Sequence, residues 1–257
     1  MSRIREAFGK EKAFIPFITA GDPDLETTEK LLYQLEEAGA NLIEIGIPFS
    51  DPVAEGEVIA RANERALKNI ITTDDIFAML ERMRHNIKIP IVFLTYMNPI
   101  FTYGKERFMK RCKEVGIDGV IIPDLPFEER EELLTESEAY EIPVITLIAP
   151  TSKDRIKRVA LHGKGFIYLV SSMGVTGVRD SIQGNIEEMV SEIRKVTDVP
   201  IAVGFGVSTP EQGKELAKYA DGVIVGSAIV KLIEKHGRNS ENPVYEYTKE
   251  MKKGINS

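Results

Sequence analysis

One carboxylate stands out because of the residues around it. Glu44 interrupts an apolar run, NLIEIGIPF, that is typical of a buried β-strand. Strand residues alternate sides, so Glu44 should share the inner side with Leu42 and Gly46, while the three isoleucines of the run face outward. Burial penalises the ionised form of a carboxyl group, which raises its pKa and suits a group that exchanges protons near neutral pH. Glu44 is therefore either an acid–base catalyst or a structural residue held by polar neighbours.

Further candidates follow strands of the same kind. Glu55 comes after a short loop, in SDPVAEG, and Tyr168 lies on the inner side of the run GFIYLVSS. A phenol among apolar residues is either a reacting group or a core tyrosine whose hydroxyl is hydrogen bonded. Tyr96, in FLTYMNP, shares its side with Leu94 and is predicted to line an apolar pocket.

Glycines gather at the ends of the last three predicted strands, in SSMGVTGVRD, GFGVS and VGSAIV. Glycine lets backbone N–H groups approach an anion, and the helix that VGSAIV opens adds a favourable dipole. Each glycine pair by itself is typical of an ordinary turn, but barrels frequently build a phosphate site from the loops after strands seven and eight. Together the three stretches predict a phosphate site that needs no lysine or arginine.

The elements that must position these groups alternate along the chain, β-rich runs with amphipathic helical runs. Eight strands are predicted, in AFIPFITAG, LIEIGIPF, PIVFLTYM, GVIIPDL, PVITLIAP, GFIYLVSS, PIAVGFGV and GVIVG. Many of the helices between them open with a predicted capping residue: Asp24, Thr72, Ser152, Asn185 or Thr209.

Eight strand–helix units in 257 residues are the number and length typical of a closed (β/α)8 barrel. An open doubly wound sheet is the alternative, but it more often carries a glycine-rich turn after its first strand, and TAGDPD is not such a turn. No proline- or serine-rich linker divides the chain, so residues 1–257 are predicted to form one TIM-barrel domain with extra short helices. The active site of a barrel lies at the carboxyl ends of the strands.

Composition and charge argue against several classes of protein. The formal net charge of -7 disfavours a nucleic-acid or anionic membrane surface, and no apolar run approaches the roughly 20 residues that span a bilayer. The single cysteine, Cys112, is expected to be part-buried, and the start of the chain lacks the apolar core of a signal peptide, so we expect a cytoplasmic protein. The three histidines lack metal-ligand spacing and are expected at the surface, so no metal site is predicted.

These features define a barrel enzyme that acts on a phosphorylated small molecule by acid–base chemistry, without a cofactor of its own. The stretches IEIGIPFSDPVAEG, PDLPFEE, SSMGVTG, GFGVSTPEQ and DGVIVGSAIV together resemble the α subunit of tryptophan synthase, in order and over nearly the whole chain. The resemblance implies cleavage of indole-3-glycerol phosphate to indole and glyceraldehyde 3-phosphate. It also implies an α2β2 heterotetramer, in which a β subunit receives the indole through a tunnel and joins it to serine with pyridoxal phosphate.

The resemblance also implies roles for individual residues. Glu44 matches the acid and base at indole carbon 3, and Tyr168 matches a tyrosine beside the reacting glycerol carbons. Glu55 stands where the family has an aspartate near the indole nitrogen. Asp124 matches an aspartate that orders a mobile loop, and Thr176 matches the threonine of that loop. The residues that match the indole pocket are Phe17, Leu94, Tyr96 and Phe205. The residues that match the phosphate cradle are Gly177, Gly206, Gly226 and Ser227.

The loop after the second strand departs from the family pattern. SDPLADG reads SDPVAEG here, and the extra methylene of Glu55 moves its carboxylate by about 1.5 Å, where a misplacement of about 1 Å can cost on the order of a hundredfold in rate. Glu57 and Ala60 replace a proline and a glutamine, and without the proline the loop is expected to be more mobile.

Two alternatives follow. The chain could be a weakly active regulatory partner of the β subunit, because Glu55 replaces the aspartate. It could also be another phosphate-binding barrel, such as an isomerase of histidine or tryptophan biosynthesis. The PFSDP loop and the absence of a suitably placed reactive cysteine disfavour that second alternative.

Overall fold

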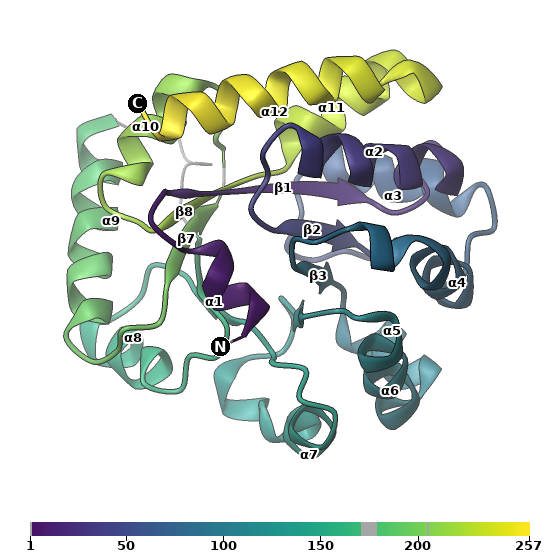
Figure 1. Ribbon diagram of the computed structural model, residues 1–257. Helices are drawn as coiled ribbons and strands as arrows, with labels where there is room; N and C mark the ends of the chain where they lie inside the picture. The colour runs from purple at the N-terminus through teal and green to yellow at the C-terminus, as the bar shows by residue number, and fades with distance from the viewer. Residues whose placement is uncertain (1, 171–178, 205) are drawn as a thin grey trace.

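A computed structural model describes residues 2–170, 179–204 and 206–257 of the protein. Within these ranges, eight parallel strands form one sheet in the order β4-β3-β2-β1-β8-β7-β6-β5. Figure 1 labels β1, β2, β3, β7 and β8. The strands are β1 (Ala13–Thr19), β2 (Ile43–Gly46), β3 (Ile91–Leu94), β4 (Gly119–Ile121), β5 (Thr146–Ile148), β6 (Ile167–Val170), β7 (Ile201–Gly204) and β8 (Gly222–Val225).

The sheet closes on itself, although unevenly. Strand β1 pairs with β2 on one side and with β8 on the other, so the first and last strands are neighbours. Strand β4 meets the segment just before β5 through one bridge among the described residues, between Val120 and Val144. The backbone N–H of Ile145 donates to Val120 O at 2.7 Å at the same point. The predicted (β/α)8 barrel is confirmed, and the seam between β4 and β5 is its weakest junction.

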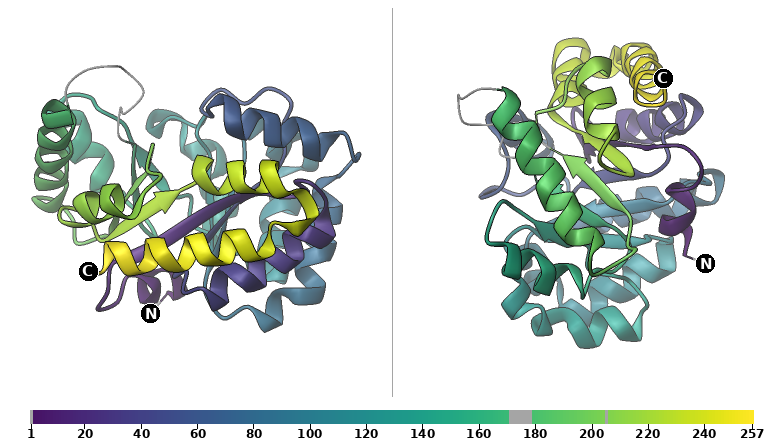
Figure 2. Two further views of the ribbon diagram at one scale, coloured as in Figure 1. Left: turned by 90° about the horizontal axis from the view of Figure 1, so that it is seen from above. Right: turned by 90° about the vertical axis from the view of Figure 1, so that its left-hand side faces the viewer.

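Helices surround the strands (Figures 1 and 2). Those that follow the strands around the outside are α2 (Leu25–Glu37), α4 (Thr73–Met83), α6 (Lys105–Val115), α7 (Glu131–Ala139), α8 (Lys153–Ala160), α9 (Arg179–Arg194), α10 (Pro210–Ala217) and α12 (Glu241–Ile255). The predicted extra helices are present as α1 (Arg3–Ala7), α3 (Glu57–Leu67) and α11 (Ser227–His236), and the sequence did not predict α5 (Met97–Tyr103) as a separate helix. Short 3-10 turns are η1 (Arg84–Asn86), η2 (Phe127–Glu129) and η3 (Gly237–Asn239).

Four of the five predicted caps bind the helix that they precede. Asp24 and Ser152 accept a hydrogen bond from a first-turn backbone N–H, and Thr72 and Thr209 each form a capping box. The prediction for Asn185 was wrong, because α9 begins at Arg179 and contains this residue. Glycine inside a helix costs only about 1 kcal/mol and asparagine less, so the Gly184–Asn185 pair does not interrupt an otherwise favourable segment.

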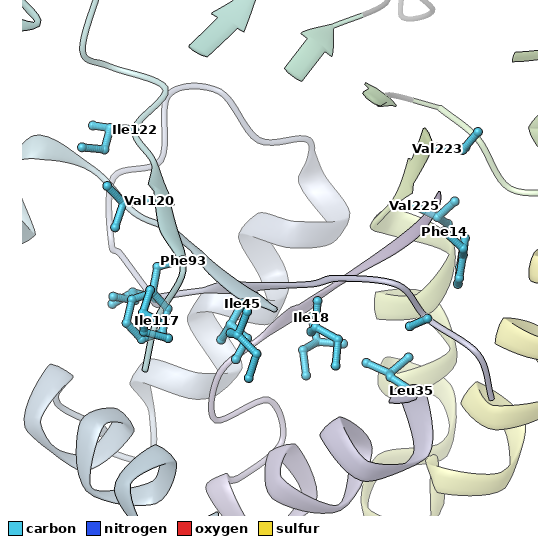
Figure 3. Packing of buried hydrophobic residues seen from close by; sticks show 14 of the residues in the cluster. Phe14, Ile18, Leu35, Ile45, Phe93, Ile117, Val120, Ile122, Val223 and Val225 are labelled. Atoms are coloured by element: carbon cyan, nitrogen blue, oxygen red, sulfur yellow. The ribbon is translucent and has the colours of Figure 1, made fainter. Parts of the chain in front are cut away.

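Strand alternation divides the apolar side chains into two layers. One layer fills the barrel interior and includes Leu42, Val92 and Phe166. The other lies between the strands and the helices; it includes Ile45 and Phe93, which Figure 3 shows. The isoleucines of NLIEIGIPF belong to this outer layer, as the alternation predicts.

The remaining sequence expectations fare unevenly. Cys112 is fully buried rather than part-buried, because its face of α6 packs into the outer layer. His85 and His162 are exposed, whereas His236 is half-buried at the end of α11. In the described ranges no cluster of three or more metal-binding side chains occurs, and none of their helices has the length and apolar character needed to cross a membrane.

Candidate active site

Glu44 lies in the barrel interior, on β2, with only 1% of its surface exposed. It stands in register with Phe17 on β1 and Val92 on β3, both members of the interior layer. Its Oε2 atom has no hydrogen-bond partner among the described residues. Burial, with a smaller contribution from the charge of Glu55, raises the pKa of Glu44 to about 8. A neutral carboxylic acid therefore predominates at neutral pH, and it can still lose its proton to a base.

Tyr168 enters the same interior from β6. Its ring lies over Gly204 of β7: a Cβ placed on that glycine would be 2.7 Å from Tyr168 Oη. Burial raises the pKa of the phenol well above its usual value, and the charge of Glu44 raises it further. Tyr168 therefore stays protonated and is a hydrogen-bond donor for an atom placed between it and Glu44.

Glu55 lies in the loop between β2 and α3 and is tied to that helix. Asn63 Nδ2 donates to Glu55 Oε2 at 2.7 Å, and the Asn63 side chain is itself buried. Burial raises the pKa of Glu55, and hydrogen bonds from Asn63 and Tyr96 oppose this rise. The carboxylate is thus held by Asn63, and the displacement expected from its extra methylene stays a prediction.

Aromatic rings line the space beside these carboxylates. Phe17, Leu94 and Tyr96 all belong to the interior layer. The ring of Tyr96 packs on Phe49 with centroids 5.2 Å apart, and its hydroxyl oxygen lies 3.4 Å from the backbone nitrogen of Ala54, from which it accepts a hydrogen bond. These contacts join the loop of Glu55 to the predicted indole pocket. Phe205, the fourth predicted member of this pocket, lies outside the described residues.

Two glycines make room for the ring of Phe17. A Cβ on Gly46 would lie 2.7 Å from Phe17 Cζ, and a Cβ on Gly226 would lie 3.3 Å from Phe17 Cδ1. Gly46 therefore cannot be replaced without moving the ring. The same aromatic side chain thus links the region of Glu44 to the end of β8.

Three predicted residues of the phosphate cradle are described, and two of them form the start of α11. Gly226 is its N-cap, and Ser227 is the first residue of the helix and is exposed. The first N–H groups of a helix have no partners within it, and together with the dipole they favour an anion. Gly206, at the end of β7, is exposed and has φ of 73°, a conformation that glycine adopts readily. Gly177 and Thr176 lie outside the described residues.

Asp124 is exposed, just after β4, and its carboxylate accepts hydrogen bonds from Met97 N at 3.0 and 3.2 Å. It thereby caps the start of α5. Its predicted contact is with a segment that contains Thr176, which is not among the described residues, so that role stays a prediction.

A cavity of about 770 Å³ opens beside this site. Ala54, Leu147 and Val170 line its inner part, and it continues outward between α7 and α8, past Leu134 and Val159. The cavity lies along the junction of β4 and β5, which few backbone contacts join. Neither Glu44 nor Tyr168 lines it, whereas Ala54, the residue before Glu55, does.

Sequence reasoning missed three polar residues near the site: Asn63, Asp22 and Arg65. Asn63 donates to Glu55, and Arg65 forms a bidentate ion pair with Asp22, whose side chain is 1% exposed. One signal was available. Asn63 stands between Ala62 and Ala66 on the apolar face of α3, and a polar residue on a buried face needs a partner.

Comparisons with known proteins agree with this geometry. The family model described as tryptophan synthase alpha chain matches residues 5–256. A tryptophan synthase alpha chain from Lacticaseibacillus casei is 46% identical over 257 residues, which cover 100% of this chain and 97% of that protein. One from Thermoanaerobacter sp. (strain X514) is 51% identical over 230 residues, which cover 90% of this chain and 88% of that protein.

Solved structures give the same result. Tryptophan synthase subunit alpha from Legionella pneumophila is similar with a TM-score of 0.90 and 35% identity, over 99% of this chain and 98% of that one. A chain of tryptophan synthase from M. tuberculosis is similar with a TM-score of 0.88 and 31% identity, over 100% and 99%. The family model matches nearly the whole chain, and the barrel and the buried Glu44 agree with it. This chain therefore belongs to the tryptophan synthase alpha chain family.

Proposed function

We propose that this chain cleaves indole-3-glycerol phosphate to indole and glyceraldehyde 3-phosphate. The observation that carries the proposal is Glu44, a fully buried acid whose pKa is raised to about 8 and which lies at the interior face of β2 among apolar residues. An acid with this pKa can give up and recover a proton at neutral pH, as general acid–base catalysis requires. Family membership supports the same reaction class, that of a carbon–carbon lyase.

The chemistry needs one proton to move in each direction. Neutral Glu44 protonates carbon 3 of the indole ring, which places the positive charge on the ring and its nitrogen. The bond from carbon 3 to the glycerol chain then breaks, and its electron pair returns to the ring as indole forms. The glycerol hydroxyl becomes the aldehyde and gives its proton to the Glu44 carboxylate, so the acid is regenerated.

Three other groups support these steps. The Glu55 carboxylate, fixed by Asn63, accepts a hydrogen bond from the indole N–H and stabilises the positive charge on the protonated ring. Tyr168 donates a hydrogen bond beside the reacting carbons, and its raised pKa keeps it protonated. The N-terminus of α11 at Ser227 binds the phosphate through backbone N–H groups.

The proposed partner is a tryptophan synthase β subunit, in an α2β2 heterotetramer that receives the indole. Similarity to a chain of M. tuberculosis tryptophan synthase supports a β-subunit partner, and the α2β2 stoichiometry follows from the family resemblance alone. Pyridoxal phosphate belongs to the proposed β subunit, and the chemistry derived above uses no cofactor in this chain. We place the reaction in the cytoplasm, as the sequence predicts.

The test is indole release from indole-3-glycerol phosphate by the wild type, Glu44→Gln and Glu55→Asp, each with and without a β subunit. We expect an active wild type and a Glu44→Gln variant slower by about 100-fold or more, because the general acid is lost. A wild type that releases no indole, even with the β subunit, contradicts the proposal. If only Glu55→Asp is active, the regulatory alternative becomes the better account; no contact of Glu55 with the described residues favours that alternative.

A further inference from the structure

Helix α3 carries a chain of polar contacts that begins at Asn63 and continues through Arg65, which the proposed chemistry does not use. Asn63 holds Glu55 at 2.7 Å, and two residues later Arg65 binds Asp22 through Nε at 2.8 Å and Nη2 at 2.7 Å. The remaining Nη1 of Arg65 donates to Glu234 Oε1 at 2.9 Å. Asp22 follows β1 and is 1% exposed, and Glu234 lies on α11. One guanidinium therefore joins three segments at the mouth of the barrel.

The same helix also contacts the start of α11. Ile59 Cδ1 lies 3.5 Å from the position of a Cβ on Gly226, the N-cap of α11. One side chain of α3, Asn63, therefore binds Glu55, the carboxylate proposed to contact the indole nitrogen. Two others, Ile59 and Arg65, contact α11, the helix proposed to bind the phosphate. The distance between the two ends of the substrate site depends on where α3 sits.

We propose that Arg65 is a positioning residue for the lyase reaction: by clamping α3 to Asp22 and Glu234, it fixes Asn63 and hence the Glu55 carboxylate. The inference rests on the proposed function. Arginine suits this role because its planar fork binds a carboxylate with two N–H groups and still has a third to offer. Lysine keeps the charge but cannot form the bidentate pair with Asp22. In Arg65→Lys, α3 therefore loses its fixed position relative to the end of β1.

Arg61 provides a matched control on the same helix. Its Nε donates to Glu234 Oε1 at 2.9 Å and its Nη2 to Glu234 Oε2 at 3.2 Å, and its side chain is 46% exposed, compared with 26% for Arg65. Arg61→Lys therefore disturbs the solvent-side part of the network and leaves the Asp22 pair in place. Exposed ion pairs contribute little, so we expect its kcat/KM to stay within about twofold of the wild type.

The experiment compares Arg65→Lys, Arg61→Lys and the wild type for indole release across pH, with the folded fraction of each measured by circular dichroism. We expect Arg65→Lys to fold and to lose about 10- to 100-fold in kcat/KM, because a shift near 1 Å at a reacting group has an effect of that size. The hydrogen bond from Asn63 lowers the pKa of Glu55, so its loss moves the acidic limb of the pH profile to higher pH. In an Asn63→Ala background, Arg65→Lys should add little, because both changes act on the same contact.

The opposite results overturn the inference. Wild-type kcat/KM in Arg65→Lys, or a loss that only follows the folded fraction with an unchanged pH profile, would make Arg65 a structural residue. If Arg65→Lys does not fold, Asp22→Asn must show the same displaced pH profile. A wild type without activity overturns the proposed function and this inference together. An active wild type with a normal Arg65→Lys overturns only the inference.

Discussion

At the scale of single residues, the site depends on two acids with different surroundings. One carboxyl oxygen of Glu44 has no hydrogen-bond partner among the described residues. No hydrogen bond there offsets the effect of burial, which raises the pKa of Glu44. Glu55 is held by Asn63 and Tyr96, which oppose the effect of burial. When their surroundings give two carboxyl groups different pKa values, one can exchange protons while the other stays ionised and stabilises positive charge. This division follows from the neighbours of each residue, since both are glutamates.

Glu44 should make stability depend on pH. Its pKa in the folded protein is about 8 and its ordinary value is 4.5, so between these pH values the folded state binds more protons than the unfolded chain. The free energy of unfolding should therefore fall as pH rises through this window, by up to about 1.4 kcal/mol per pH unit from this group. Urea unfolding of the wild type and Glu44→Gln from pH 5 to 8 measures the difference. Parallel curves for the two proteins would show that Glu44 does not have the raised pKa.

We expect the packing of the Tyr168 ring to require glycine at position 204. A methyl group there would lie 2.7 Å from Tyr168 Oη, so Gly204→Ala must displace the ring or the strand. We expect a loss of about 1–3 kcal/mol in unfolding free energy and a larger proportional loss in indole release. Gly9→Ala is the control, because its nearest contact would be an ordinary 3.4 Å. Equal effects of the two substitutions would argue against a packed tyrosine at this position.

At the scale of elements, α3 and its contacts hold the loop that precedes it. Glu57, where the family pattern has proline, is the first residue of α3, directly after the N-cap Gly56. A first-turn N–H has no partner within the helix, so proline is tolerated there but not required. The loop before it is held instead by Asn63 and by the contact of Ala54 with Tyr96. The absence of proline therefore does not leave the loop without anchors.

Two proline substitutions on α3 should have opposite outcomes. Glu57→Pro places proline at the first helical position and should raise the free energy of unfolding by roughly 0.4–1 kcal/mol by restricting the unfolded chain. Glu64→Pro, in the interior of the same helix and exposed, should lower it by about 3 kcal/mol or more. Thermal and urea unfolding measure both. A large loss in Glu57→Pro would mean that α3 starts earlier than the structure has it.

At the scale of the whole molecule, the barrel is uneven. Strand β1 is paired on both sides, whereas one bridge joins β4 to the segment just before β5 in the described chain, and the cavity of about 770 Å³ lies along that seam. A junction with few backbone contacts opens at lower free energy than one with many. That residues 1–257 form one domain stays a prediction, which a single cooperative unfolding transition would support.

Hydrogen exchange should reveal the seam. We expect backbone amides of residues 143–148 to exchange faster than those of 13–19, because the second segment is paired to strands on both sides. Mass spectrometry of the native protein after deuterium labelling compares the two segments directly, with β8 as an internal reference. Equal protection of both segments would show that helix packing compensates for the missing strand pairs.

The sequence by itself determined the barrel, because the alternation of strand and helix patterns leaves few other folds that bury every apolar face. It also determined the inward direction of Glu44, since strand periodicity fixes sides. It misjudged the start of α9 at Asn185, because a glycine–asparagine pair is a weak local signal that helix formation overrides.

Only the tertiary structure decided how the site is held. Asn63 and Glu55 are eight positions apart, Arg65 and Asp22 are 43 apart, and Arg65 and Glu234 are 169 apart. No local pattern encodes such pairs, because their contact depends on how α3 lies across the ends of β1 and α11. The pKa of Glu44 is likewise a tertiary property: the strand pattern predicts burial, but the extent of desolvation depends on every side chain that fills the barrel.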